Sequence, residues 1–471
     1  MKTDLFYNMK QTIPLIQTRR KWLTLMLSCI LIVTGVHAQQ SDDELTLQKA
    51  LQYALKANQD ARKARLDQEN AGYEIEEVRA GALPQVSGTA SLNYNPILQQ
   101  SALPGDFVGQ PGTTLLVAFG QKWNANAGVN VSQALFDKSV FTGLKAARST
   151  QEYYRLQAQL TEEQVIENVA SLYYQILIQR QKIAVVDSNI KNTTRVRDII
   201  TGQFENGLAK RIDVDRTKVN LSNLHTQRQQ LINGVILAEN ELKFAMGMPI
   251  QLPVIIPASD KSADVLSSVA DADFQVGSRL EYRTLTQQAK LLEFQKEAYK
   301  AEYYPSLSLS GNYSYQGLGN NFPLFKGSSQ GVNWFDYASM GLTLKIPIFN
   351  GFATRARVRK ADISIRKLNE DLSKISLSLN KDFENAKMQI TNNQLILKTQ
   401  EENAALAKEV YFNVLNNYNQ GLASLTDLIN SENEMTESQN NYSSALLDYR
   451  IAQIQLLKAQ GQLKTLVGSP Q

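Results

Sequence analysis

Two aspartates, Asp213 and Asp427, occupy the same place in two similar stretches of the sequence. Each lies six residues after a glycine, Gly207 or Gly421, that is followed by Leu-Ala. A carboxylate there can attract cations, and several together raise one another's pKa values by repulsion. It can equally cap a helix or complement the positive end of the helix dipole. The residues alone leave both roles open.

Residues suited to catalysis or metal binding are scarce. The single cysteine, Cys29, lies near the start of the chain, and after residue 38 the one histidine is His225, within a segment of helical pattern. Residues 109–114 contain glycine but lack the Gly-Lys-Ser/Thr of a phosphate-binding loop. We therefore expect no enzymatic activity, no metal site and no cofactor.

Residues 1–38 are typical of a secretory signal peptide. Three basic residues, 19–21, precede an apolar run, 22–33, that is too short to cross a bilayer, and residues 36–38 match a signal-peptidase site. Lipidation of Cys29 is disfavoured because the apolar run continues past it. The leader carries five of the 49 basic and one of the 45 acidic residues, so the rest is formally neutral and no nucleic-acid partner is expected.

Two long spans, Leu144–Thr201 and Phe352–Gln420, contain neither glycine nor proline. Proline breaks helices, so these spans can form helices of roughly 90 to 100 Å. Apolar residues recur every seven positions, which is typical of a coiled-coil seam. These residues are Val169, Ile176, Ile183 and Ile190, and later Leu428, Met435, Tyr442, Tyr449, Leu456 and Leu463.

Four other segments, 85–95, 123–135, 307–315 and 338–348, alternate apolar residues with Ser, Thr and Asn and carry almost no charge. A half-buried soluble sheet shows the same alternation, but the lengths and the signal peptide favour tilted transmembrane strands. Aromatic residues near the strand ends suit the two membrane interfaces. They are Tyr94, Trp123, Phe136, Trp334, Phe335, Tyr337 and Phe349.

The order of helix, strand hairpin, long helix and return helix occurs twice, and four pairs of short motifs keep that order, so we predict an internal duplication. The first repeat spans 39–246, with a hairpin at 85–136 and a tip turn near 202–210; a connector spans 247–277; the second repeat spans 278–471, with a hairpin at 305–349 and a tip turn near 418–423.

Four strands per chain cannot close a barrel, and open sheet edges are not tolerated in lipid. The chain must therefore oligomerise through its strands. Two chains would give eight strands and a barrel filled by its own side chains, whereas three would give twelve and leave a lumen. A conduit thus needs at least three copies.

With these features the chain resembles the TolC-like outer membrane efflux family, over nearly all of its length after the leader. The resemblance rests on Ile346–Gly351, on a weaker echo at Gln133–Asp137 and on the duplicated Gly-Leu turn. It implies an α+β membrane protein, a trimer that joins a transmembrane β-barrel of four strands per chain to a periplasmic α-barrel of coiled-coil helices. Such a protein lies in the outer membrane of a Gram-negative-type envelope and extends into the periplasm.

The resemblance also implies a function and partners. The chain would be the outer membrane channel of a tripartite efflux or type I secretion assembly, a passive gated export duct. Its partners would be outer membrane lipid, a periplasmic adaptor and an inner-membrane transporter that supplies the energy.

Residue by residue, the resemblance assigns roles at the two tips. The adaptor would dock at Asn206, Gly207 and Leu208 and at Gln420, Gly421 and Leu422, and the periplasmic gate would consist of Asp213, Asp427, Phe204 and Tyr418. The sequence departs from the family where Ala423 replaces a gating arginine and Asn430 a further aspartate. Lys210 and Arg211 could supply cationic partners instead.

Two other classes of protein combine long helices with β segments. A periplasmic adaptor carries one helical hairpin flanked by split β domains, whereas this chain has two copies of the whole pattern. A coiled-coil envelope protein would not need the alternating strands. We therefore predict the export channel and keep the adaptor or envelope protein as the alternative.

Overall fold

The computed structural model describes residues 44–109, 111–257 and 274–468. The leader with Cys29 and much of the expected connector lie outside them. The chain divides into two units. In the smaller one, described at 44–45 and 253–257, the Leu45 N–H donates to the Ile255 carbonyl oxygen at 2.7 Å. Every helix and strand described below belongs to the larger unit.

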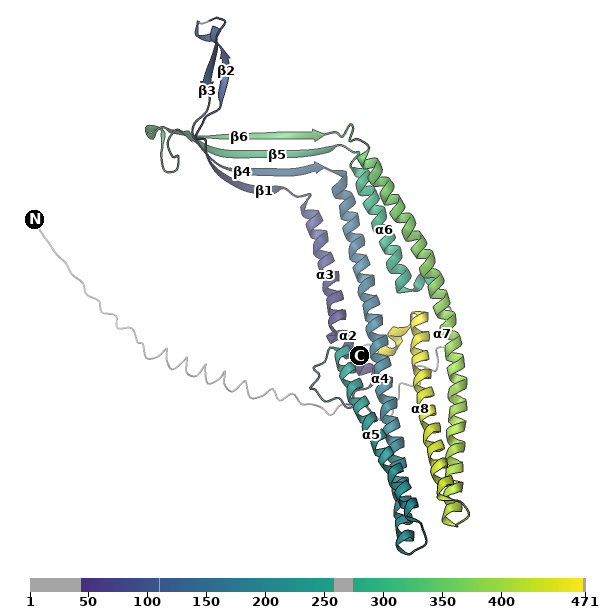
Figure 1. Cartoon of the computed structure of the whole chain (residues 1–471). Coiled ribbons are helices and arrows are strands. Elements are labelled where there is room, and N and C mark those ends of the chain that lie inside the picture. Colours follow the sequence, from purple (N-terminus) through teal and green to yellow (C-terminus); the bar gives the residue numbers. More distant parts are fainter. Residues whose placement is uncertain (1–43, 110, 258–273, 469–471) are drawn as a thin grey trace, which may run out of the picture. The chain divides into compact units, whose positions relative to one another are not determined.

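Four antiparallel strands form one sheet in the order β1-β4-β5-β6 (Figure 1). Their bounds are Gln85–Tyr94 for β1, Trp123–Phe136 for β4, Ser306–Gly319 for β5 and Val332–Lys345 for β6. All four predicted strands are present, but β6 begins and ends earlier than expected. Pro347 lacks the N–H needed to continue the ladder, whereas residues 332–337 pair with β5.

The two faces of this sheet differ in polarity. One cross-strand row contains Val86, Val131, Gly311 and Met340, and the next contains Ser87, Asn130, Asn312 and Ser339. On the polar face, amides bond across strands: Asn312 Nδ2 donates to Asn130 Oδ1 at 2.6 Å. The apolar face is uncovered in the single chain, where Met340 is 82% exposed.

Aromatic rings gather near both ends of the sheet. At one end Trp123 lies 4.5 Å from Tyr94 and 5.1 Å from Phe322, measured between ring centroids. At the other, Phe349 lies 5.4 Å from Phe352. The loop between β1 and β4 also contains a feature that the sequence did not predict, a two-stranded ribbon formed by β2 (Gln100–Pro104) and β3 (Thr114–Ala118).

Helices make up the rest of the larger unit. Their bounds are Leu47–Ala57 for α2, Gln59–Ala80 for α3, Lys138–Glu205 for α4, Arg211–Met246 for α5, Leu280–Ala301 for α6, Ala353–Asn419 for α7 and Leu425–Gln460 for α8. The long helices α4 and α7 each pair with a shorter return helix, α5 and α8 (Figure 1). No helix among the described residues is both long and apolar enough to cross a membrane.

Helix α4 runs past both glycines that bounded the predicted span, Gly143 and Gly202. A glycine inside a helix costs only about 1 kcal/mol, which the packing of a 68-residue helix tolerates. The heptad seam is buried at Val169 and Ile176 but only half-buried at Ile183. A helix with 3.6 residues per turn drifts away from a seven-residue repeat, so burial moves to other positions farther along.

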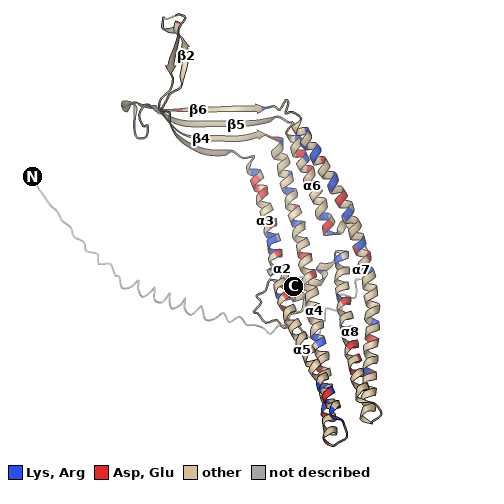
Figure 2. Ribbon diagram, viewed as in Figure 1, with Lys and Arg blue, Asp and Glu red and all other residues tan. Residues whose placement is uncertain are grey.

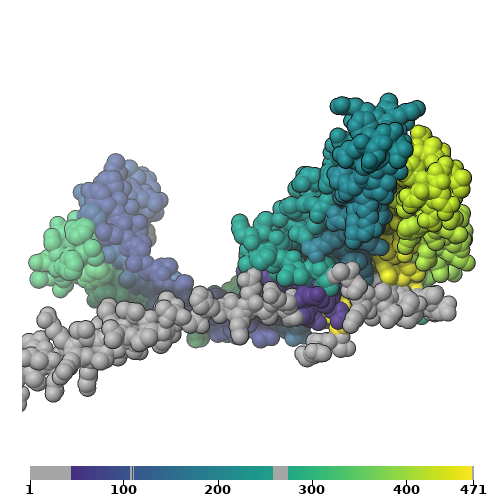
Figure 3. Space-filling model, turned by 90° about the horizontal axis from the view of Figure 1, so that it is seen from below, coloured from purple at the N-terminus to yellow at the C-terminus, as the bar shows by residue number. Residues whose placement is uncertain are grey.

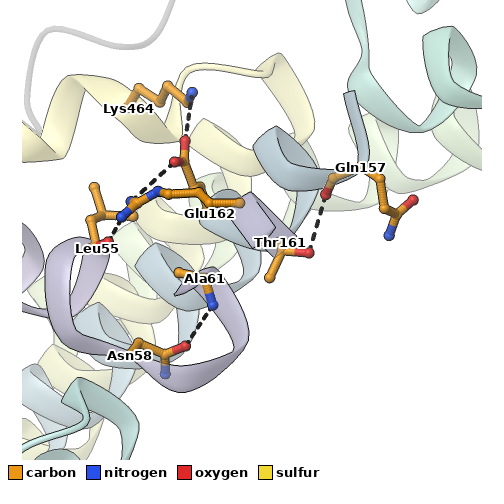
Figure 4. Close-up of polar contacts among 8 residues, drawn as sticks. Leu55, Asn58, Ala61, Gln157, Thr161, Glu162 and Lys464 are labelled. Carbon is orange, nitrogen blue, oxygen red and sulfur yellow. Dashed lines mark hydrogen bonds and ion pairs between the residues drawn. The ribbon is translucent and has the colours of Figure 1, made fainter. Parts of the chain in front are cut away.

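Hydrogen bonds and ion pairs join α3, α4 and the segment after α8. Asn58 caps α3 by accepting from the Ala61 N–H, and Glu162 of α4 binds Lys464 at 3.2 Å (Figure 4). Arg65 of α3 binds the same carboxylate at 3.3 Å. This clasp anchors the segment after α8 against the first half of the chain.

Charged residues are concentrated on the helices, and the sheet is almost free of them (Figure 2). Within β1, β4, β5 and β6 the only charged residues are Asp336 and Lys345, both in β6. Burying charge in hydrocarbon is costly, so this distribution is compatible with lipid around the sheet and water around the helices.

Candidate functional site: the paired helix tips

At both tips the chain reverses over a glycine with a left-handed backbone. Gly207 has φ +76° and Gly421 has φ +73°. In each turn the following residue closes the helix end: the Leu208 N–H donates to Gln203 O and the Leu422 N–H to Asn417 O, both at 2.8 Å. Only glycine adopts this φ without strain, which accounts for the matching turns.

The two tips are held together by one hydrophobic cluster that draws on four helices. Its buried members are Val196 and Ile200 of α4, Val214 of α5, Tyr411 of α7, and Leu425, Leu428 and Met435 of α8. Figure 3 shows the teal surface of the α4–α5 tip directly beside the yellow surface of α8. The two tips therefore share one packed hydrophobic cluster.

Asp427 is exposed and forms a reciprocal cap at the start of α8. Its Oδ2 accepts from the Ser424 N–H at 3.0 Å and from the Ser424 hydroxyl at 2.6 Å, while its own N–H donates to Ser424 Oγ at 3.2 Å. These bonds from Ser424 hold the pKa of Asp427 below its ordinary value. At this position the capping role is therefore present.

Asp213 occupies the same helical position in α5, but its surroundings differ. The residue before α5, Lys210, makes no side-chain cap, and Asp213 is half-buried. Its charge acts on Tyr418 of α7. Burial is the main cause that raises the pKa of Tyr418, and the Asp213 carboxylate adds to it. The structure thus brings together two of the four predicted gate residues, one from each tip.

The remaining predicted residues make fewer contacts at the tips. Phe204 is 40% exposed, whereas Tyr418 packs against the cluster, so the two aromatic residues are not equivalent. Arg211 lies 3.8 Å from Asp215, one turn along its own helix, and not against Asp213 or Asp427. Leu208 and Leu422 are 81% and 75% exposed, which leaves an apolar side chain in the open at each tip.

A groove of about 550 Å³ runs between α5 and α8 just above the tips. Ile212 and Val219 line it from α5, and Ile429 and Asn430 from α8. Arg216 crosses it, with Nη1 3.3 Å from the Thr426 hydroxyl oxygen. Asn430, noted as a departure from the family pattern, therefore faces this groove.

Two features of the site escaped prediction. Ser424 precedes Asp427 by three residues, the spacing of a capping box, and that signal was present in the sequence. Glu432 is a buried carboxyl group on the face of α8 that also carries Leu428 and Met435. Among the residues described, no group of His, Cys, Asp and Glu is arranged to hold a metal ion.

The model of the outer membrane efflux protein family matches residues 50–248 and 286–462. The outer membrane protein TolC of Vibrio cholerae is 21% identical over 399 residues, which cover 84% of this chain and 86% of that protein. The alkaline protease secretion protein AprF of Pseudomonas aeruginosa is 22% identical over 334 residues, 69% of this chain and 67% of that protein.

Solved structures share the fold. The outer membrane protein VceC of Vibrio cholerae superposes with a TM-score of 0.68 at 14% identity, covering 88% of this chain and 96% of that one. The open state of the MtrE outer membrane channel of Neisseria gonorrhoeae gives 0.68 at 18% identity, covering 90% and 91%.

Proposed function

Because this chain belongs to the outer membrane efflux protein family, it is an outer membrane channel protein that extends into the periplasm, and we propose that it forms a passive, gated export duct. The observation that carries the proposal is the pair of joined helix tips together with a nearly uncharged sheet that has one apolar face. Family membership argues against the periplasmic adaptor and the coiled-coil envelope protein.

The duct is a trimer in this proposal. Strands β1 and β6 are the edges of the sheet and each pairs on one side only. Edges exposed to lipid leave N–H and C=O groups unsatisfied, so β6 of one copy pairs with β1 of the next. Three copies give twelve strands, with the amides of Asn130 and Asn312 lining a wet lumen and Met340 facing lipid.

The internal duplication supports the same arrangement. Each half supplies two strands of the sheet and one helical hairpin, and we propose the repeats 39–246 and 278–471 joined by the connector 247–277. The family model matches in two segments that flank part of that connector. In the trimer, six hairpins would surround the periplasmic tunnel.

At the tips, the exposed Leu208 and Leu422 would contact a periplasmic adaptor, which in turn connects the duct to an inner-membrane transporter. The two tip motifs, Asn206-Gly207-Leu208 and Gln420-Gly421-Leu422, present these leucines on rigid turns. In this proposal the chain performs no chemistry and the transporter supplies the energy. One relative is named for secretion of an alkaline protease, but the cargo of this duct follows from its transporter.

The gate of the proposed duct contains Asp213 and Asp427, with Tyr418 and Phe204 beside them. Three copies would place six carboxylates around the constriction, where they attract cations and repel anions. Of the two aspartates, the half-buried Asp213, whose charge acts on Tyr418, is the more suitable to sense closure, because Asp427 is already bound by its cap.

Single-channel recording of the purified oligomer in planar bilayers tests this function. We expect Asp213→Asn together with Asp427→Asn to lower the cation-to-anion permeability ratio and to weaken block by divalent cations. Asp198→Asn, on α4 beside Arg197, is the matched control and should leave both unchanged. Equal selectivity in all three proteins would remove the aspartates from the gate, and no conductance at all would refute the duct.

A further inference from the structure

Glu432 of α8 is a carboxyl group enclosed between helices, with only 4% of its surface exposed. The Thr193 hydroxyl of α4 bonds its Oε1, and the Asn220 amide of α5 donates to its Oε2 at 3.0 Å. One side chain therefore ties α8 to both helices of the other hairpin. It lies one turn beyond Leu428, a member of the cluster that joins the tips.

The hydroxyl of Thr193 allows this network to hold a protonated Glu432 as well as an ionised one. It lies within hydrogen-bonding reach of Glu432 and also 2.8 Å from the carbonyl oxygen of Asn189. A hydroxyl has one proton, so it donates to only one of them. If it donates to Asn189, the carboxyl must itself be protonated and donate to Thr193, and then every bond is satisfied.

No opposite charge compensates a carboxylate here. Thr193 bonds it from α4 and Asn220 from α5, Tyr411 of α7 interacts with its charge, and no described Lys or Arg pairs with it. Burial raises the pKa of Glu432, opposed by the bonds from Thr193 and Asn220. Tyr411 is buried with its hydroxyl unbonded, and burial, with a smaller contribution from the Glu432 charge, raises the pKa of Tyr411 to about 12.

We propose that Glu432 is a proton-operated latch that holds α8 against the α4–α5 hairpin while the periplasmic tips are closed. The proposal rests on the gated duct proposed above and adds a residue that controls its closure. To separate α8 from the other hairpin, the bonds to Thr193 and Asn220 must break and the carboxyl group must enter water.

The direction of the pH effect follows from linkage. In the open duct the hydrated carboxyl group titrates near its ordinary value of 4.5, whereas the closed network binds the proton more tightly. Acidification therefore favours closure. Between pH 4.5 and the higher closed-state value, one proton per chain changes the closing equilibrium by up to about tenfold per pH unit. Above that range Glu432 is ionised in both states and the closing equilibrium no longer changes with pH.

The experiment uses the purified oligomer in planar bilayers across this pH range, in an Asp213→Asn, Asp427→Asn background that removes the other gate carboxylates. We expect the parent protein to close on acidification. Glu432→Gln imitates the protonated carboxyl group, so it should stay closed up to pH 8. Glu432→Ala loses both bonds and should stay open at every pH. Glu434→Gln, an exposed site on the same helix, is the matched control and should follow the parent.

A normal pH response in Glu432→Gln would overturn the latch. If Glu432→Ala does not assemble, Thr193→Val removes one of the bonds with little change of shape and should open the duct in the same way. Hydrogen exchange of the α8 amides supplies a readout that needs no conductance. At pH 8, corrected for the intrinsic rate, exchange around residue 432 should be slower in Glu432→Gln than in the parent. Equal exchange would refute the latch even if the duct conducts.

Discussion

The tip glycines offer a prediction whose size can be worked out from the backbone. At Gly207 an added Cβ would meet no atom within 4 Å, so Gly207→Ala introduces no clash. Its φ of +76° is nevertheless a left-handed conformation that costs an L-residue about 1–2 kcal/mol. We expect the turn to open more often while the rest of the chain remains folded and inserted.

Two other glycines calibrate that cost. Gly202, inside α4, also has open space around an added Cβ but an ordinary helical backbone, so Gly202→Ala should stabilise the helix by about 0.5–1 kcal/mol. At Gly247, φ is +71° and an added Cβ would lie 2.6 Å from the carbonyl oxygen of Ala57. Gly247→Ala combines strain with a clash and should be the most destabilised of the three.

Amide hydrogen exchange measures the local effect at the Leu208 N–H, which closes the end of α4. We expect Gly207→Ala to exchange about 5–30 times faster there than the parent, the factor that corresponds to 1–2 kcal/mol. Gly202→Ala should be unchanged or slower. If Gly207→Ala were as protected as Gly202→Ala, the left-handed glycine would not be what shapes the tip.

Two further predictions concern the joined tips. Leu428→Ala removes a side chain that is 1% exposed and should lower the free energy of unfolding, measured with a chemical denaturant, by about 2–5 kcal/mol. Leu406→Ala, at an exposed site on α7, is the control and should lower it far less. Equal losses would contradict the cluster. The capping bonds of Asp427 lower its pKa, so their stabilisation is present above its ordinary value of 3.8 and is lost as the pH falls through the lowered value. After correction for the intrinsic exchange rate, protection at the start of α8 should fall over that range in the parent but not in Ser424→Ala, and an identical acid response in both proteins would exclude the cap.

The sequence predicted the long helices and the strands because their signals are local. Proline placement, alternation along Trp123–Leu135 and the glycine in each tip turn all reflect constraints on the backbone of a few neighbouring residues. The extents of β6 and α4 were less accurate. The extent of β6 depends on the partner strand that is available, and that of α4 on how far packing offsets the cost of a glycine such as Gly202. A local sequence pattern contains neither kind of information.

The arrangement within the site was less predictable. The similar settings of Asp213 and Asp427 in the sequence concealed different environments, because Ser424 caps one helix whereas Lys210 precedes the other. The electrostatic interaction between Asp213 and Tyr418 joins residues about 200 positions apart, and periodicity carries no information on such pairs. In the sequence Glu432 does not differ from the other polar residues of a coiled coil, and only the structure shows that it is buried.

The unpaired edges of β1 and β6 also have a genetic consequence. In the proposed trimer each copy closes the wall with both of its neighbours, so a single damaged edge opens one junction in every trimer that contains that copy. With equal expression of normal and damaged chains, only about one trimer in eight would contain three normal copies if they mix at random. Mutations at these edges should therefore be dominant, whereas mutations that prevent folding altogether should be recessive.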